Sequence, residues 1–315
     1  MRHILNRVYL TTDQLHLRDQ KQLHDCKIAL VLTTDRMTIP TIADDVVYQR
    51  VAVAQSRDDF DTITATIRQM VESGRAVLID AENENSPSFL MAIAYLMDAV
   101  GMTFPNAYMR MVVAYSMLNV DLSVLLAAYN LPYHQSRDLH GNLIALSRTA
   151  VSPISDQLFI SGIEALENPD KARGAGIHAV LRLDRGSERA ALQWPSHYKL
   201  LDIPIHDGTL IPSEILRQGS AFIHRHIKAG DKVLVHCMMG MSRSVTVVLA
   251  YLVEYAGMSL ADAYALVVKV RPIAQPHPAL LQSLVQTYNL SVGDVWNVNF
   301  LDRLLTAANP LTLRR

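Results

Sequence analysis

The sequence predicts an α/β protein made of two tandem copies of one domain, each with a central, mostly parallel sheet flanked by helices. Two observations support this prediction. The segment GDKVLVHCMMGMSRSVTVVLAYLVEYAGMSLADAY, from Gly230, aligns without a gap with the segment that starts 156 residues earlier at Gly74. In each copy, short apolar runs rich in β-branched residues alternate with longer amphipathic stretches, which is the pattern of strands interleaved with helices.

The repeat extends beyond this segment and sets the expected domain boundaries. The run IHAVLRLDR from Ile177 faces IALVLTTDR from Ile28. We therefore expect one domain over residues 1–148 and a second over residues 149–315. The segment SRTAVSPIS around Pro153 has the composition of a connector between them.

The elements of the second copy follow from periodicity and from stop signals. Apolar or alternating runs predict strands over Ala179–Leu183, across Leu201, Ile203 and Ile205, and over Lys232–His236. Amphipathic stretches with capping signals predict helices over Ser213–Ile227, from Ser244 to a stop at Gly257, and from the N-cap Ser259, with Asp262 as its partner, to a stop before Pro272. In parallel α/β domains, ligands bind at the carboxyl ends of the strands.

Composition restricts the partners of the protein. The formal net charge is −1, so the chain has no general attraction for nucleic acid or an anionic membrane. The longest apolar run, Phe89–Met97, is too short to span a bilayer, and the N-terminus lacks the apolar core of a signal peptide. The two cysteines, Cys26 and Cys237, have no secreted-scaffold spacing. We expect a cytoplasmic protein without cofactor or metal, and with neither nucleic acid nor membrane as partner.

The segment VLVHCMMGMSRS has the layout of a phosphate-binding loop. A strand leads to Cys237, five residues follow, and Arg243 stands where a helix begins. The expected phosphate contacts are the backbone N–H groups of the loop and the helix N-terminus. The loop residues are Met238, Met239, Gly240, Met241, Ser242 and Arg243. Gly240 allows a backbone conformation that side chains disfavour, and the Arg243 guanidinium fits two phosphate oxygens.

The same surroundings favour the reactive form of Cys237. A helix N-terminus and a neighbouring guanidinium both favour the thiolate, which is the nucleophile. A thiolate facing a bound phosphate can attack in line and form a phosphocysteine. Ser244 can donate a hydrogen bond to the sulfur as it leaves. The C-terminal half is therefore predicted to be a cysteine-dependent phosphatase for a phosphorylated side chain or a similar monoester.

Over roughly Ile154 to Leu290 the sequence resembles the dual-specificity branch of the protein tyrosine phosphatase superfamily. The segments ISDQLFISG, IHAVLRLD, HCMMGMSRS and AYL match the family pattern. This resemblance implies a general acid, an aspartate on a loop upstream of the cysteine. In LDIPIHDGTLIP the matching residue is Asp207, with Asp202 in the strand pattern as the weaker alternative and His206 as a neighbour only.

The first copy has other residues at these positions and thus resembles a pseudophosphatase. The replacements are Ala81 for Cys237, Pro87 for Arg243, Glu84 for Gly240 and Asp80 for His236, while Asp207 faces Gln55 with Asp58 nearby. The carboxylates of Asp80, Glu82 and Glu84 repel phosphate, and drift after loss of function explains them more simply than a Ca²⁺ or Mg²⁺ site. We interpret Cys26 as an inert core thiol.

Three functions compete for the whole chain. The first is a phosphatase for phosphotyrosine, and for phosphoserine or phosphothreonine, in a protein substrate. The second is a phosphatase for a non-protein monoester, such as a phosphoinositide, an RNA 5′-phosphate or a phosphoglucan. Methionines rather than lysines at 238, 239 and 241 argue for the protein substrate. The third is a binding scaffold, which suits the first copy, and we expect that copy to contact the second.

Overall fold

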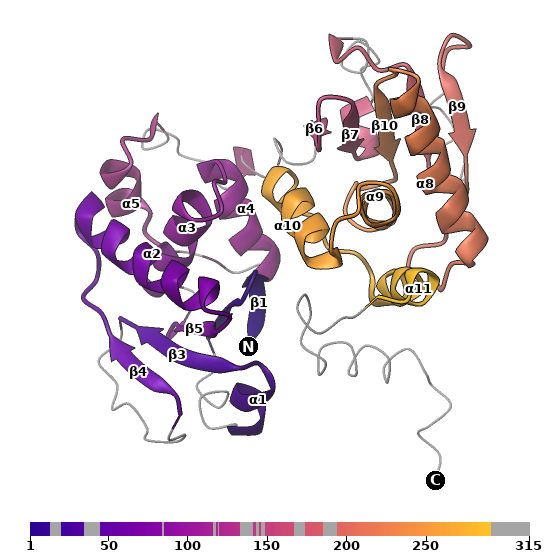
Figure 1. Cartoon of the computed structure of the whole chain (residues 1–315). Coiled ribbons are helices and arrows are strands. Elements are labelled where there is room, and N and C mark those ends of the chain that lie inside the picture. The colour runs from indigo at the N-terminus through magenta and orange to yellow at the C-terminus, as the bar shows by residue number, and fades with distance from the viewer. Residues whose placement is uncertain are drawn as a thin grey trace. The chain divides into compact units, whose positions relative to one another are not determined.

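The computed structural model describes residues 1–12, 20–34, 45–83, 85–115, 118, 120–132, 141–142, 145, 149–166, 174–184 and 194–290. The chain divides into two compact units, Met1–Leu143 (the first unit) and Ile144–Arg315 (the second unit) (Figure 1). Within the described ranges no helix is long and apolar enough to cross a membrane.

The first unit contains a five-stranded sheet with the order β1-β2-β5-β3-β4. Its strands are β1 (Arg2–Leu5), β2 (Val8–Thr11), β3 (Ile28–Thr33), β4 (Val47–Arg50) and β5 (Ala76–Asp80). Its helices are α1 (Gln20–Asp25), α2 (Arg57–Glu72), α3 (Ser88–Asp98), α4 (Phe104–Ala114) and α5 (Ser123–Ala128). Only β1 and β2 pair antiparallel; the other described pairs are parallel.

The second unit contains a five-stranded sheet with the order β6-β7-β10-β8-β9. Its strands are β6 (Ser152–Pro153), β7 (Leu158–Ser161), β8 (Ala179–Arg182), β9 (Lys199–Asp202) and β10 (Val233–His236). The 3₁₀ helix η3 (Ile163–Leu166) follows β7, and the α-helices are α8 (Ser213–Lys228), α9 (Arg243–Glu254), α10 (Leu260–Val270) and α11 (Pro278–Tyr288). Here too only the first two strands, β6 and β7, pair antiparallel among the described pairs. The two sheets therefore share one strand order and one set of strand directions.

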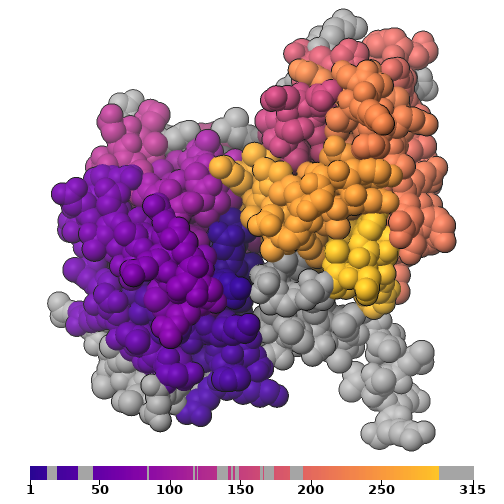
Figure 2. Space-filling model, in the orientation of Figure 1, coloured from indigo at the N-terminus to yellow at the C-terminus, as the bar shows by residue number. Residues whose placement is uncertain are grey.

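The centre of the second unit is built from β10 and α9. Every residue of β10 is buried, because β7 and β8 pair with it on either side. Helix α9 is buried along most of its length, and Gly219 of α8 lets the two helices approach closely: a Cβ there would lie 2.7 Å from Val247 Cγ1. Helix α11 buries one side, and Figure 2 shows its outward side in yellow at the surface of this unit.

Most of the expected elements are confirmed to within a residue or two. Helix α8 begins at Ser213 as predicted, and α10 ends at Val270, before Pro272. The Ser259 hydroxyl caps α10 by accepting from the Asp262 N–H at 3.1 Å. Gly257, with φ +67°, stands just beyond α9.

Two sequence-based expectations were wrong, and both concern an edge strand of the second sheet. The strand predicted across Leu201, Ile203 and Ile205 ends at Asp202. Ile203 N still donates to Arg182 O, but Ile205 N donates to Leu183 O and not to the next carbonyl in the regular pattern, so the ladder with β8 becomes irregular there. Pro153 was predicted to lie in a connector, but it belongs to β6, which pairs with β7. As an edge strand, β6 tolerates a residue without a backbone donor.

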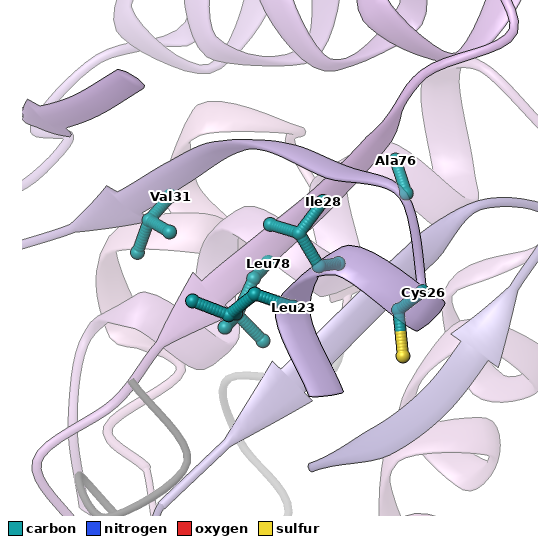
Figure 3. Close-up of a cluster of buried hydrophobic side chains, with 6 residues drawn as sticks. All are labelled: Leu23, Cys26, Ile28, Val31, Ala76 and Leu78. Carbon is teal, nitrogen blue, oxygen red and sulfur yellow. The ribbon is translucent and has the colours of Figure 1, made fainter. Parts of the chain in front are cut away.

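Cys26 lies in a hydrophobic cluster of the first unit with Leu23, Ile28, Val31, Ala76 and Leu78 (Figure 3). Its side chain is 6% exposed. This burial agrees with the expectation of a packed, structural thiol.

Candidate active site

Cys237 stands directly after β10, at the carboxyl end of the parallel strands. It is 2% exposed, and α9 starts six residues further on at Arg243. Gly240, between them, has φ +65°, the left-handed conformation expected of a glycine in this loop. The strand, turn and helix predicted from the sequence are therefore present around the cysteine.

Two groups lie within hydrogen-bond distance of the Cys237 sulfur. The backbone N–H of Gly240 donates to Sγ at 3.2 Å, and the Ser244 hydroxyl oxygen is 3.2 Å from Sγ. Ser244 is fully buried. A donor aimed at sulfur stabilises negative charge on it, so both contacts suit a thiolate.

The carbonyl groups of the loop all point outward, to partners in the surrounding structure. Ile163 N donates to Met238 O at 2.9 Å and Gln275 N to Met241 O at 2.8 Å. The two carbonyls between Met238 and Met241 accept from a side chain: the Arg271 guanidinium donates to Met239 O at 3.0 Å and to Gly240 O at 2.5 Å.

This outward orientation determines where the N–H groups point. In a trans peptide, C=O and the next N–H point in opposite directions, so four outward carbonyls turn the N–H groups of residues 239–242 inward. Inward N–H groups that converge on one centre bind anions. The loop thus has the geometry of a phosphate cradle.

Arg271 is the main support behind this loop. It is 1% exposed, and its Nη1 also donates to Ala150 O at 3.2 Å and to Ser152 Oγ at 3.3 Å. Burial lowers the pKa of Arg271 to about 10, which leaves the guanidinium charged at neutral pH. It therefore adds positive charge beneath the cradle while it holds the loop backbone.

Close packing requires glycine at two positions. A Cβ on Gly240 would lie 2.5 Å from the carbonyl carbon of Ser161 and 2.6 Å from Gly162 N. A Cβ on Gly162 would lie 2.9 Å from the carbonyl carbon of Met239. The loop can rest against the end of β7 only because neither residue has a side chain.

The segment after β9 contacts the phosphate loop through two residues. Arg243 is 5% exposed, and its Nη1 donates to Ile205 O at 3.3 Å. The carboxylate of Asp207 accepts from the Ser242 hydroxyl at 2.7 Å. Asp207 itself is exposed.

The alternative acid, Asp202, is engaged elsewhere. It ends β9 and forms an ion pair with Arg182 of β8. His206 is exposed, and its backbone carbonyl accepts from the Thr209 hydroxyl. Of the two aspartates, the structure brings Asp207 to the phosphate loop.

A buried polar pair lies next to Cys237. His236 Nδ1 is 3.6 Å from Asp184 Oδ1, and the two side chains are 0% and 2% exposed. Burial lowers the pKa of His236 to about 3, and burial raises the pKa of Asp184 although Arg182 and Arg243 act against that shift. The histidine before Cys237 is therefore neutral at physiological pH.

The sequence analysis missed Arg271, Asp184 and His277. Arg271 precedes Pro272, and sequence alone does not distinguish a buried arginine at a helix end from an exposed one. His277 caps α11 by accepting from Ala279 N at 3.2 Å, and its own N–H donates to Ser242 Oγ at 2.9 Å. Nothing in the run PHP around it indicates a contact with the phosphate loop.

The corresponding positions of the first unit contain different chemistry. Ala81 directly follows β5 and is fully buried, and Pro87 directly precedes α3. Glu84, the third carboxylate of the suggested metal site, lies outside the described residues. Among those that are described, no group of three metal-ligating side chains is arranged to hold an ion.

Comparison with known proteins places this chain among phosphatases. The family model "Dual specificity phosphatase, catalytic domain" matches residues 158–290. Dual specificity protein phosphatase 1B of Arabidopsis thaliana is 34% identical, and the match covers 43% of this chain and 80% of that protein. Dual specificity protein phosphatase 1 of the same organism is 46% identical, with coverage of 42% and 66%.

Two further matches add context. Phosphatidylglycerophosphate phosphatase PTPMT2 of Arabidopsis thaliana is 29% identical, over 40% of this chain and 57% of that protein. The crystal structure of human DUSP28 is 25% identical with a TM-score of 0.41, over 44% of this chain and 93% of that chain.

The matched region contains the whole cradle, from β7 to the end of α11, and identifies the second unit as a phosphatase domain of the protein tyrosine/dual-specificity class. The chain belongs to the dual specificity phosphatase family.

Proposed function

We propose that the second unit hydrolyses phosphate monoesters through a phosphocysteine on Cys237. The thiolate attacks phosphorus, the S–P bond forms and the bond from phosphorus to the leaving oxygen breaks. Asp207 gives its proton to that oxygen. The loop N–H groups and the Arg243 guanidinium hold the phosphoryl oxygens, whose charge they stabilise throughout the transfer.

The second step regenerates the enzyme. Asp207, now a carboxylate, takes a proton from water as the water oxygen attacks phosphorus. The S–P bond breaks, inorganic phosphate forms, and the sulfur leaves as thiolate. The Ser244 hydroxyl, 3.2 Å from Sγ, donates to the departing sulfur.

One observation carries this proposal. The sulfur of Cys237 lies at the base of a loop whose carbonyls all point outward, and the Gly240 N–H already donates to it. A bound phosphate would sit above the sulfur, with inward N–H groups around its oxygens. This is the arrangement for in-line attack.

The substrate we propose is a phosphoprotein, at phosphotyrosine and at phosphoserine or phosphothreonine. The names of the two similar dual specificity protein phosphatases support it. The loop side chains support it as well, because Met238, Met239 and Met241 add no charge for a multiply phosphorylated ring.

A second candidate is a lipid phosphate monoester. The observation that favours it is the match to a protein whose name describes phosphatidylglycerophosphate as its substrate. A panel of phosphopeptides, phosphatidylglycerophosphate and phosphoinositides distinguishes the two. Faster turnover of a lipid than of every phosphopeptide would replace the first candidate by the second.

We further propose that the first unit is a catalytically inactive copy of the same domain, with a structural or substrate-docking role beside the second. The shared strand order of the two sheets supports a common origin. Ala81 has no group that can attack phosphorus, and Pro87 has no guanidinium. The chain would then contain one catalytic centre.

The nucleophile is tested by Cys237→Ser in the full chain. Turnover should fall to background, while inorganic phosphate should still bind in calorimetry, because the loop and Arg243 are unchanged. The same variant tests the first unit, because an inactive first unit leaves the Cys237→Ser protein without residual activity. Turnover in the purified variant would contradict the assignment of Cys237 as the only nucleophile of the chain.

The acid is tested by Asp207→Asn. The rate on a phosphotyrosine peptide, a poor leaving group, should fall by about 10²–10⁴. The loss should be much smaller on para-nitrophenyl phosphate, whose phenolate leaves without a proton. An equal loss on both substrates would assign the acid elsewhere, and Asp202→Asn is the matched control because Asp202 is paired with Arg182.

A further inference from the structure

Ser242 occupies the N-cap of α9 but does not cap it. A serine at this position ordinarily accepts a hydrogen bond from the backbone two or three residues on. Here φ is −122° and ψ is −75°, and the side chain makes no cap hydrogen bond. Ser242 is 7% exposed, and its hydroxyl donates instead to Asp207 in the segment between β9 and α8, residues 203–212, called here the acid segment.

The direction of the two hydrogen bonds of this hydroxyl follows from its partners. The His277 N–H can only donate, so Ser242 Oγ accepts from it at 2.9 Å. A hydroxyl has one proton, and the remaining short contact is to Asp207 Oδ1 at 2.7 Å. The hydroxyl proton is therefore directed to Asp207.

The His277 donor is itself held in place. His277 begins α11, with Nδ1 accepting from Ala279 N, and its ring lies against the acid segment: a Cβ on Gly208 would be 3.5 Å from Nε2. The same helix also binds that segment further on, since Ser283 Oγ accepts from Ile211 N at 2.8 Å. The start of α11 thus holds the His277 N–H in the position from which it donates to the Ser242 hydroxyl.

We propose that Ser242 and the backbone N–H of His277 are positioning groups that orient Asp207 for proton transfer. This proposal rests on the role of Asp207 stated above. Because Ser242 occupies Oδ1, a proton on the carboxyl stands on Oδ2, the oxygen left to face the leaving group. The hydroxyl at the N-cap serves the acid and not the helix.

The first test removes and restores the hydroxyl. Ser242→Ala should lower kcat/KM on a phosphotyrosine peptide by about tenfold, the rate equivalent of one hydrogen bond, with a much smaller loss on para-nitrophenyl phosphate. Ser242→Thr keeps a hydroxyl and should recover most of the loss. Equal losses on the two substrates would overturn the proposal, since they would indicate a damaged phosphate loop.

The second test removes the backbone donor. His277→Pro eliminates the N–H, and φ −62° and ψ 142° at this position suit proline. His277→Ala is the matched control, because both variants lose the ring and only proline loses the donor. The proline variant should reproduce the substrate dependence of Ser242→Ala, and the alanine variant should not. Similar kinetics for the two would exclude the N–H from the mechanism.

The third test separates this proposal from the assignment of the acid. With Asp207→Asn as background, Ser242→Ala should cause no further loss on the phosphotyrosine peptide. A full additional loss would mean that Ser242 acts without Asp207, which overturns the positioning role. If Asp207→Asn alone shows no leaving-group dependence, the acid assignment fails first. Thermal unfolding of every variant identifies losses that come from instability.

Discussion

His236 is a buried base whose pKa is lowered, so that it stays neutral at pH values where an exposed histidine is protonated. Its pKa is about 3 in the folded protein, against an ordinary value near 6.5 in the unfolded chain. Between these two values the unfolded chain binds a proton that the folded protein does not bind. The free energy of unfolding therefore falls as pH decreases through this window, by at most about 1.4 kcal/mol per pH unit from this group.

We expect this dependence to disappear in His236→Asn. The measurement is chemical unfolding of the second unit between pH 6.5 and 4. Asp184 reduces the wild-type slope, because its raised pKa means that the folded protein binds its proton more readily than the unfolded chain. A wild-type slope no steeper than that of the variant would show that His236 is not held neutral.

At the scale of single residues, the sequence predicts those whose role depends on order along the chain. Cys237, Gly240 and Arg243 follow one another in a loop, so spacing and chemistry indicate their arrangement before the structure is known. Arg271 and His277 approach the same loop from later in the chain. Their contacts depend on where α10 ends and α11 begins in space, which local spacing does not contain.

At the scale of elements, two glycines with the same backbone conformation differ in their surroundings. Gly240 and Gly257 have φ +65° and +67°. A Cβ on Gly257 meets nothing within 4 Å, whereas one on Gly240 collides with Arg271 and the end of β7. Replacing either glycine by alanine therefore has the same conformational cost. Only at Gly240 is there an additional steric cost.

Gly257→Ala should therefore lower the free energy of unfolding by about 1–2 kcal/mol and leave kcat unchanged. Gly240→Ala should cost more stability and abolish most activity, because the loop must move away from β7. Denaturant unfolding and phosphatase assays on both variants measure the difference. Equal effects would indicate that the loop does not need the close approach to β7.

Helices and strands were predictable where their ends depend on residues that are adjacent in sequence. They were less predictable where an end depends on pairing with another strand. The start of α8 and the Ser259 cap follow from residues that are adjacent in sequence. The end of β9 depends on a shift in its hydrogen bonding to β8 between Ile203 and Ile205, which the apolar alternation of the segment does not indicate. Pro153 joins β6 because Ser152 and Pro153 pair with Ile160 and Phe159 of β7, and that pairing is not visible in the segment itself.

At the scale of the whole molecule, the repeat in the sequence predicted two sheets, and two sheets of equal strand order are present. Strand order itself was not predicted, because β5 and β10 are late in sequence and central in space. Their central position results from pairing with a strand on each side, and apolar runs alone do not determine which strands pair.

We expect the second unit to need the first for stability or substrate docking. Residues 144–315 expressed alone should unfold more easily than the full chain, or lose activity on phosphoproteins while keeping it on para-nitrophenyl phosphate. Thermal unfolding and parallel assays measure these outcomes. A fragment as stable and as active as the full chain on every substrate would remove both roles from the first unit.

The side chain of Arg271 joins the phosphate loop to Ala150 O and Ser152 Oγ, at the start of the second unit. The side chain of Ser152 in β6 and the backbone of the phosphate loop are thus attached to one guanidinium. A protease cut, a fusion or an altered linker near residue 150 should consequently change the catalytic rate. Evolution of the sequence around residue 150 would then be constrained by catalysis as well as by folding.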